Sequence, residues 1–100
     1  MDNRPISRSA IPNLEDLPED VKTKIQSVQE KTGFVPNVFM IMARKPDEFR
    51  GFCTYYDAIM ETECNMTKAE LEMIVVATSA QNDCLYCVVS HGAVLRIRSK

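Results

Sequence analysis

The chain has 100 residues, of which 45% are hydrophobic and 26% are charged, and its formal net charge is -2. These values are ordinary for a soluble globular protein and exclude disordered and fibrous classes. The length suits one compact domain over residues 1–100. Basic residues are scattered, apart from Arg96, Arg98 and Lys100 near the end, so we expect no nucleic-acid partner.

The N-terminal region lacks the apolar stretch of a signal peptide, and the longest apolar run, residues 38–43, is far too short to cross a membrane. We therefore expect a cytoplasmic protein with no membrane partner. In a reducing compartment, the four cysteines are more consistent with reactive thiols or small core residues than with a structural disulfide framework.

Residues 1–15 contain two prolines and show no periodicity, which predicts an extended N-terminal arm. A helix is expected to begin at Asp16 or Leu17, with Pro18 in its first turn, and to end at Gly33. Its apolar face is narrow, which places this helix on the outside of the protein. That face consists of Val21, Ile25 and Val28.

A short second helix is expected over residues 38–45, capped by Asn37 and ending before Pro46. Pro46 then begins a longer helix with one apolar stripe, which should supply most of the aromatic core. The stripe contains Phe49, Phe52, Cys53, Tyr56, Ile59 and Met60.

Thr67 and Glu70 have the spacing of a capping box, in which each side chain binds a free backbone N–H at the start of a helix. The following residues 71–80 are apolar on nearly all sides, which predicts a helix buried in the middle of a bundle. Asp83 can cap a last helix over residues 84–98. Since no strand-like alternation occurs, the predicted fold class is all-α.

Cys84, Cys87 and His91 share one face of the last predicted helix, within an arc of roughly 60°. Both cysteines lie at its N-terminus, where free N–H groups and the helix dipole lower the pKa of a thiol. A histidine one turn further on can take up or return a proton near neutral pH. This constellation predicts a reactive thiol centre.

Two other interpretations stay open for these residues. The cysteines can be small core residues beside a hydrogen-bonded histidine, or they can bind zinc, which needs Cys53 or Cys64 as a further ligand. We expect no metal and no cofactor; Cys53 is expected in the core and Cys64 exposed. Periodicity slightly favours a solvent-facing Glu72, whereas the chemistry would use its carboxylate to orient His91.

The motif region, residues 66–98, includes the phrase MTKAELEMIVVATSAQNDCLYCVVSHGAVLR and resembles the alkylhydroperoxidase D-like family, also called the carboxymuconolactone decarboxylase superfamily. Its motif is Glu, eleven residues, Cys, two residues, Cys, three residues, His, and it is matched by Glu72, Cys84, Cys87 and His91. Tyr86, Gly92 and the upstream phrase FVPNVFMIMARKP resemble the peroxidase-related branch in particular.

This resemblance implies a helical bundle that forms homo-oligomers, commonly trimers or hexamers, and reduces hydroperoxides. Cys87 would attack the peroxide, Cys84 would resolve the product as a disulfide, and His91 would relay protons while Glu72 polarises it through a water. An external thiol, possibly a dihydrolipoyl protein, would restore the thiols. Members of this branch continue through several more helices, so we expect a bundle truncated after the cysteine helix.

Two other functions stay open. The chain could be a non-catalytic oligomerisation or regulatory subunit in which the motif is vestigial. Alternatively, it could act like the carboxymuconolactone decarboxylases, which share the fold. The latter lack the cysteine pair, so the pair favours the thiol peroxidase.

Overall fold

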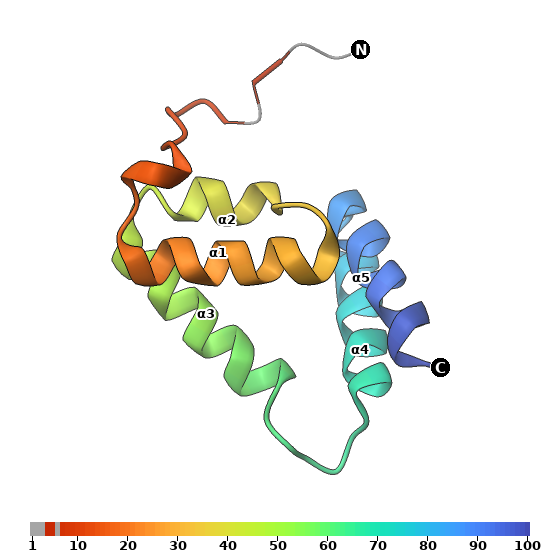
Figure 1. Ribbon diagram of the computed structural model, residues 1–100. Coiled ribbons are helices and arrows are strands. Elements are labelled where there is room, and N and C mark those ends of the chain that lie inside the picture. The colour runs from red at the N-terminus through yellow and green to blue at the C-terminus, as the bar shows by residue number, and fades with distance from the viewer. Residues whose placement is uncertain (1–3, 6) are drawn as a thin grey trace. The chain divides into compact units, whose positions relative to one another are not determined.

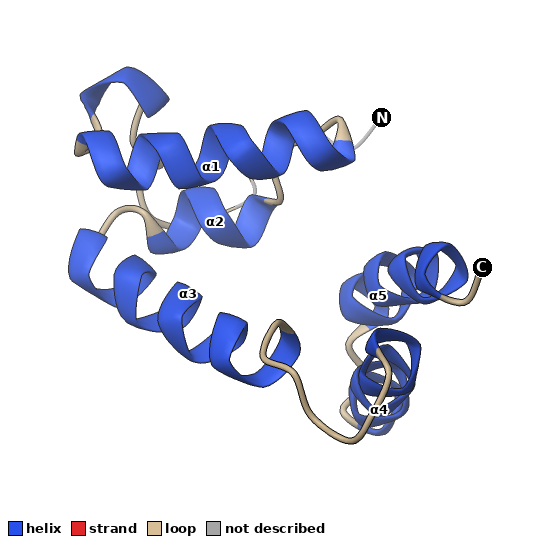
Figure 2. Cartoon of the chain, turned by 60° about the horizontal axis from the view of Figure 1, so that its bottom comes forward, coloured by secondary structure: helices blue, strands red, loops and turns tan. Residues whose placement is uncertain are grey.

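The computed structural model describes residues 4–5 and 7–100, and these contain helices and no strand (Figures 1 and 2). The predicted all-α class is therefore confirmed. The helices are η1 (Leu14–Asp16), α1 (Glu19–Thr32), α2 (Asn37–Met42), α3 (Pro46–Met60), α4 (Lys68–Gln81) and α5 (Leu85–Arg98).

The chain divides into two compact units, Met1–Tyr55 and Tyr56–Lys100, here called the N-terminal unit and the C-terminal unit. Each is described by itself. That all 100 residues act as a single domain stays a prediction.

The predicted arm over residues 1–15 includes residues 1–3 and 6, which lie outside the described part. Its last residues belong to η1, a short 3-10 helix that the sequence did not predict. Helix α1 begins at Glu19, later than predicted, because Pro18 has an extended ψ of 148° and takes the N-cap position. It ends as predicted at Gly33, whose φ of 83° is accessible to glycine at little cost.

Helix α2 differs from its prediction at both ends. Pro36 is the N-cap, with an extended ψ of 134°, and Asn37 is the first helical residue, so the predicted Asn37 cap was wrong. The helix stops at Met42 instead of continuing to Lys45, since the residues before Pro46 form a turn in which the Lys45 N–H donates to the Met42 carbonyl.

The N-terminal unit has a continuous apolar core. In Figures 1 and 2, α1 and α2 lie side by side. The ring of Phe39 packs edge-on against Phe49, with centroids 5.5 Å apart. Cys53 packs against the same core, as predicted. The fully buried members of this core are Val21, Ile25, Ala43 and Phe49.

The C-terminal unit is built around α4 and α5, which run antiparallel and side by side (Figures 1 and 2). The predicted capping box is present, because Thr67 accepts from the Glu70 N–H while Glu70 accepts from the Thr67 N–H. Three residues connect α4 to α5, which makes the pair a helical hairpin.

The prediction that α4 is buried on all sides was wrong. Its buried residues are Glu72 and Ser79, whereas Met73 and Ile74 are about half exposed. One neighbouring helix covers only one face of an apolar helix, which explains the exposure. The exposed large apolar residues of this unit are Ile59, Met66, Met73, Ile74, Leu85, Tyr86, Val89 and Ile97. Among the described helices none is long and apolar enough for a membrane span.

Candidate redox site

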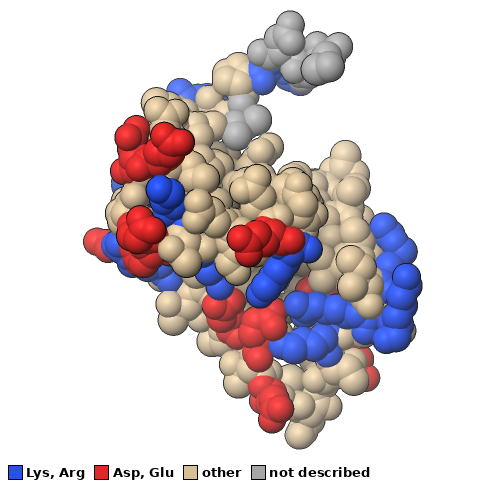
Figure 3. All heavy atoms as spheres, viewed as in Figure 1, with Lys and Arg blue, Asp and Glu red and all other residues tan. Residues whose placement is uncertain are grey.

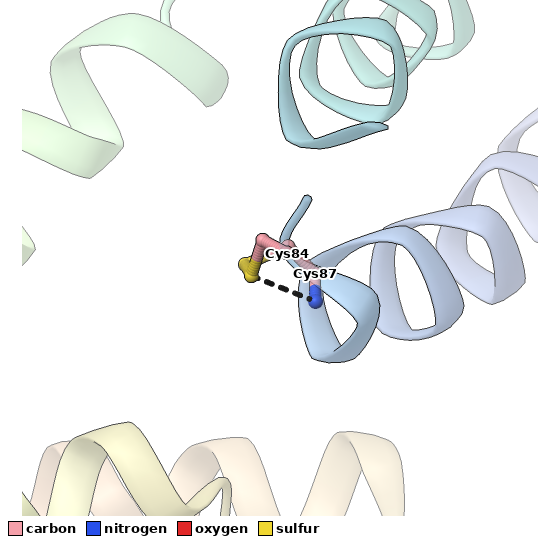
Figure 4. The surroundings of a disulfide bond; sticks show 2 residues. All are labelled: Cys84 and Cys87. Carbon is pink, nitrogen blue, oxygen red and sulfur yellow. Dashed lines mark hydrogen bonds between the residues drawn. A yellow bond between two sulfur atoms is a disulfide. The ribbon is translucent and has the colours of Figure 1, made fainter. Parts of the chain in front are cut away.

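Cys84 and Cys87 are joined by a disulfide at the start of α5 (Figure 4), with their Cα atoms 5.3 Å apart. Cys84 is the N-cap of this helix, and its Sγ accepts a hydrogen bond of 3.3 Å from the Cys87 N–H. The predicted Asp83 cap was therefore wrong. Asp83 instead has a φ of 54°, a left-handed conformation that aspartate tolerates better than most residues.

The turn between the helices fixes the position of Cys84. Its N–H donates to the carbonyl of Ser79 at 2.9 Å, and the Asp83 N–H donates to the Ala80 carbonyl at 3.1 Å. The last turn of α4 and the first turn of α5 are thus tied together directly at the cysteine pair. In the reduced state, the free N–H groups there would stabilise a thiolate.

Glu72 and His91 form the centre of this unit. The Glu72 side chain is 0% exposed, and its Oε2 lies 2.8 Å from Nδ1 of His91, whose side chain is 25% exposed. The solvent-facing position that periodicity favoured for Glu72 was therefore wrong, and the contact with His91 is direct rather than through a water. With the carboxylate ionised, Nδ1–H donates to it, and Nε2 keeps a lone pair that can accept a proton.

The second oxygen of Glu72 faces Arg98. Oε1 lies 3.5 Å from Nη1 of Arg98, and these two buried atoms have no hydrogen-bond partner in the described part of the chain. The other end of the guanidinium donates to Glu61 at 3.0 Å. Glu61 also accepts from Lys68 at 2.7 Å, and Lys68 donates further to the Met60 carbonyl. A chain of charges thus runs from the surface to the buried carboxylate.

This electrostatic environment shifts the pKa values of two residues, Glu61 and Tyr56. The pKa of Glu61 is lowered, chiefly by its hydrogen bond with Lys68; burial opposes this shift, and the hydrogen bond with Arg98 adds a smaller lowering effect. The pKa of Tyr56 is raised, first by burial and next by the negative charge of Glu72. Tyr56 is therefore neutral at physiological pH.

Sequence reasoning missed Arg98, Glu61 and Lys68. A usable signal existed for Arg98, since it follows His91 by seven residues and so lies on the same helix face. Glu61 and Lys68 flank the connection between α3 and α4, and no local pattern places their side chains beside α5.

The other two cysteines, Cys53 and Cys64, form no disulfide. Cys53 is partly buried and Cys64 is exposed, as predicted for both. Within residues 4–5 and 7–100, no group of three His, Cys, Asp or Glu side chains is arranged to hold a metal ion. A hollow in the N-terminal unit, lined by residues 9–12, 16–18, 43–44 and 46, contains none of the predicted site residues.

These features define an all-helical protein with a cysteine pair at the start of α5 and, on the same helix pair, a buried glutamate bound to a histidine. The sequence profile described as the carboxymuconolactone decarboxylase family matches residues 46–99, and the chain belongs to this family. The predicted resemblance is thereby confirmed. No curated protein matches the chain.

Two solved structures are similar to the chain. One is the alkylhydroperoxidase AhpD core of an uncharacterized peroxidase-related protein from Ralstonia eutropha JMP134, with 58% identity, a TM-score of 0.90, and coverage of 96% of this chain and 50% of that one. The other is an uncharacterized peroxidase-related protein from Silicibacter sp. TM1040, with 34% identity, a TM-score of 0.77, and coverage of 95% and 53%. The chain thus spans about half the length of each and has the AhpD-like fold.

Proposed function

We propose that this protein is a thiol peroxidase that reduces alkyl hydroperoxides through Cys84 and Cys87. The observation that carries the proposal is a disulfide at the first turn of α5 together with a fully buried Glu72 bound to His91 on the same helix pair. Membership in a family with peroxidase-related relatives adds support. Within this proposal, Cys84, Cys87 and His91 are catalytic residues, and Glu72 is a positioning residue.

In the first step, Nε2 of His91 takes the proton of the Cys87 thiol. Cys87 is assigned the attack because it precedes His91 by four residues and so lies one turn away on the same face. The thiolate attacks the terminal peroxide oxygen, the O–O bond breaks, and Cys87 becomes a sulfenic acid. The leaving alkoxide takes the proton back from His91 and departs as an alcohol.

In the second step, the Cys84 thiol attacks the sulfur of Cys87. The S–O bond breaks, hydroxide leaves with the Cys84 proton as water, and the disulfide forms. An external dithiol, such as a dihydrolipoyl group on a protein, then supplies two electrons and two protons and is itself oxidised to a disulfide. Glu72 holds the ring of His91 and stabilises its charged form during the first step.

A homo-oligomer belongs to the same proposal. The C-terminal unit exposes many large apolar side chains, with Leu85 at 76% and Ile97 at 70% exposure, which is unusual for a surface that stays in water. Sedimentation of the intact chain tests this part separately from the chemistry.

The test is peroxide consumption by the full chain with a small dithiol as reductant. Wild type is expected to turn over and, without reductant, to lose two hydrogens in intact mass as Cys84 and Cys87 join. Cys84→Ser and Cys87→Ser should each abolish turnover, whereas Cys64→Ser, which changes an exposed free cysteine, should not. Full turnover in both variants of the pair would refute the proposal, and inert thiols would favour the non-catalytic subunit.

A further inference from the structure

We propose that Arg98 is a positioning residue for this site, whose charge helps the pair formed by buried Glu72 and partly exposed His91 to release its proton during the reaction. The inference deepens the proposed function and rests on it for its catalytic meaning. It is carried by the contact between a guanidinium and the second oxygen of a fully buried carboxylate.

Arg98 is built into the site by its place on α5. It follows His91 by seven residues, so both side chains lie on the helix face that meets Glu72. Its side chain is only 25% exposed. Lys and Arg side chains gather over the C-terminal turns of α5 (Figure 3). Arg98 is partly buried and lies against Glu72, whereas Arg96 is exposed.

The guanidinium lies between two carboxylates and is hydrogen-bonded to one of them. Nη2 donates to Oε1 of Glu61, and Nη1 faces Oε1 of Glu72. Glu61 is in turn fixed by Lys68, which also donates to the Met60 carbonyl. Because the planar fork of arginine spans two carboxylates at once, it places its charge at Glu72 with little freedom to move away.

A charge count shows what Arg98 contributes. Arg98 and Lys68 are positive, and Glu61 and Glu72 are negative, so this group of four is neutral when the His91 ring is neutral. Tyr56, which also interacts electrostatically with Glu72, is uncharged at neutral pH. Without Arg98, the buried carboxylate would have a protonated His91 as its one close cation, and the pair would hold that proton more tightly.

The test uses Arg98→Met, Arg98→Lys and, as a matched control on the same helix, Arg96→Met. The chain contains a single histidine, so the ring signals of His91 can be followed by NMR in the intact protein across pH. Arg98→Met should raise the midpoint of this titration by about one pH unit or more. Arg98→Lys should keep it near the wild-type midpoint, and Arg96→Met should leave it unchanged.

The pH profile of peroxide-driven disulfide formation should shift upward in Arg98→Met in parallel with the His91 titration. A merely structural role would lower the rate at every pH without moving either midpoint. An unchanged or lowered midpoint in Arg98→Met, or an equal rise in Arg98→Lys, would overturn the inference.

A second variant serves if Arg98→Met does not fold. Glu61→Gln removes a negative charge from the other end of the guanidinium, at a site that is 43% exposed. It should therefore lower the His91 midpoint, opposite to Arg98→Met, and an unchanged or raised midpoint would overturn the inference. If wild type consumes no peroxide while these midpoints shift as stated, the proposed function fails and the electrostatic role of Arg98 stands.

Discussion

The two units use the same kind of helix in opposite ways. In the N-terminal unit, apolar residues such as Ile25 and Phe49 are buried, and ion pairs such as Arg50 with Asp20 lie on the surface. In the C-terminal unit, the fully buried side chain of α4 is Glu72, and apolar residues such as Val89 are exposed. The first arrangement stabilises the fold. The second places a buried carboxylate, that of Glu72, against α5, the helix that begins at the cysteine pair.

The largest expected effect is a loss of stability. It is tested by truncating one isoleucine to alanine in each unit. Ile25→Ala removes a side chain that is 0% exposed and should lower the free energy of unfolding by about 2–5 kcal/mol in urea titrations. Ile97→Ala is the matched comparison, and at a protein concentration low enough to keep the chain monomeric it should change this free energy by less than about 0.5 kcal/mol. A large loss for Ile97→Ala would show that its face is covered in solution.

The next largest effect is expected on activity, for a substitution that preserves the shape of a buried side chain. Glu72→Gln keeps the volume of the buried side chain but removes the charge that faces His91, and it should slow peroxide reduction about 100-fold. Stopped-flow kinetics would measure the rate, with exposed Glu63→Gln as the control. A rate within twofold of wild type would remove Glu72 from the proposed machinery.

A smaller effect concerns how helices begin. In the C-terminal unit, Thr67 caps α4 through its side chain, whereas α2 in the N-terminal unit begins without a side-chain cap. Thr67→Ala should therefore cost about 1 kcal/mol of stability, and Asn37→Ala should cost less than about 0.5 kcal/mol. Equal losses in thermal or urea unfolding would contradict this contrast.

The smallest expected effect is at the surface of the N-terminal unit. The hydrogen bonds from Arg50 lower the pKa of Asp20 from 3.8 to about 2. Since the folded value is the lower one, the associated stability is present above pH 3.8 and is lost as the pH falls toward 2. NMR of the Asp20 carboxyl carbon should give that low midpoint, and Arg50→Gln should return it toward 3.8 with little change in stability.

Sequence reasoning succeeded where the cause was local. Two such features are the capping box at Thr67 and Glu70 and the helix end at Gly33. Each depends on residues within one turn, so a stretch of four or five residues contains the whole interaction. The spacing of Cys84, Cys87 and His91 likewise belongs to one helix. These features were readable without any knowledge of the neighbouring elements.

It failed where the cause lay on another element. Periodicity treated Glu72 as a solvated residue because an average over α4 cannot include the cations that α5 brings to it. Asp83 looked like the better cap by residue type, yet the turn gives it a left-handed backbone and leaves the cap to Cys84. The burial of Glu72 and the choice of the N-cap of α5 thus both depend on contacts with the other helix of the pair.

The three-residue connection between α4 and α5 has a consequence for how this motif tolerates change. It sets the register in which Glu72 meets His91 and Arg98, and the Cys84 N–H is anchored to Ser79 within it. Because this short connection is hydrogen-bonded to the last turn of α4, a single insertion or deletion there would change the register in which the acid meets the histidine while leaving both helices intact. The eleven-residue interval of the motif therefore sets how Glu72 and His91 face each other. Insertions or deletions in the connection should disrupt the proposed site more often than substitutions do.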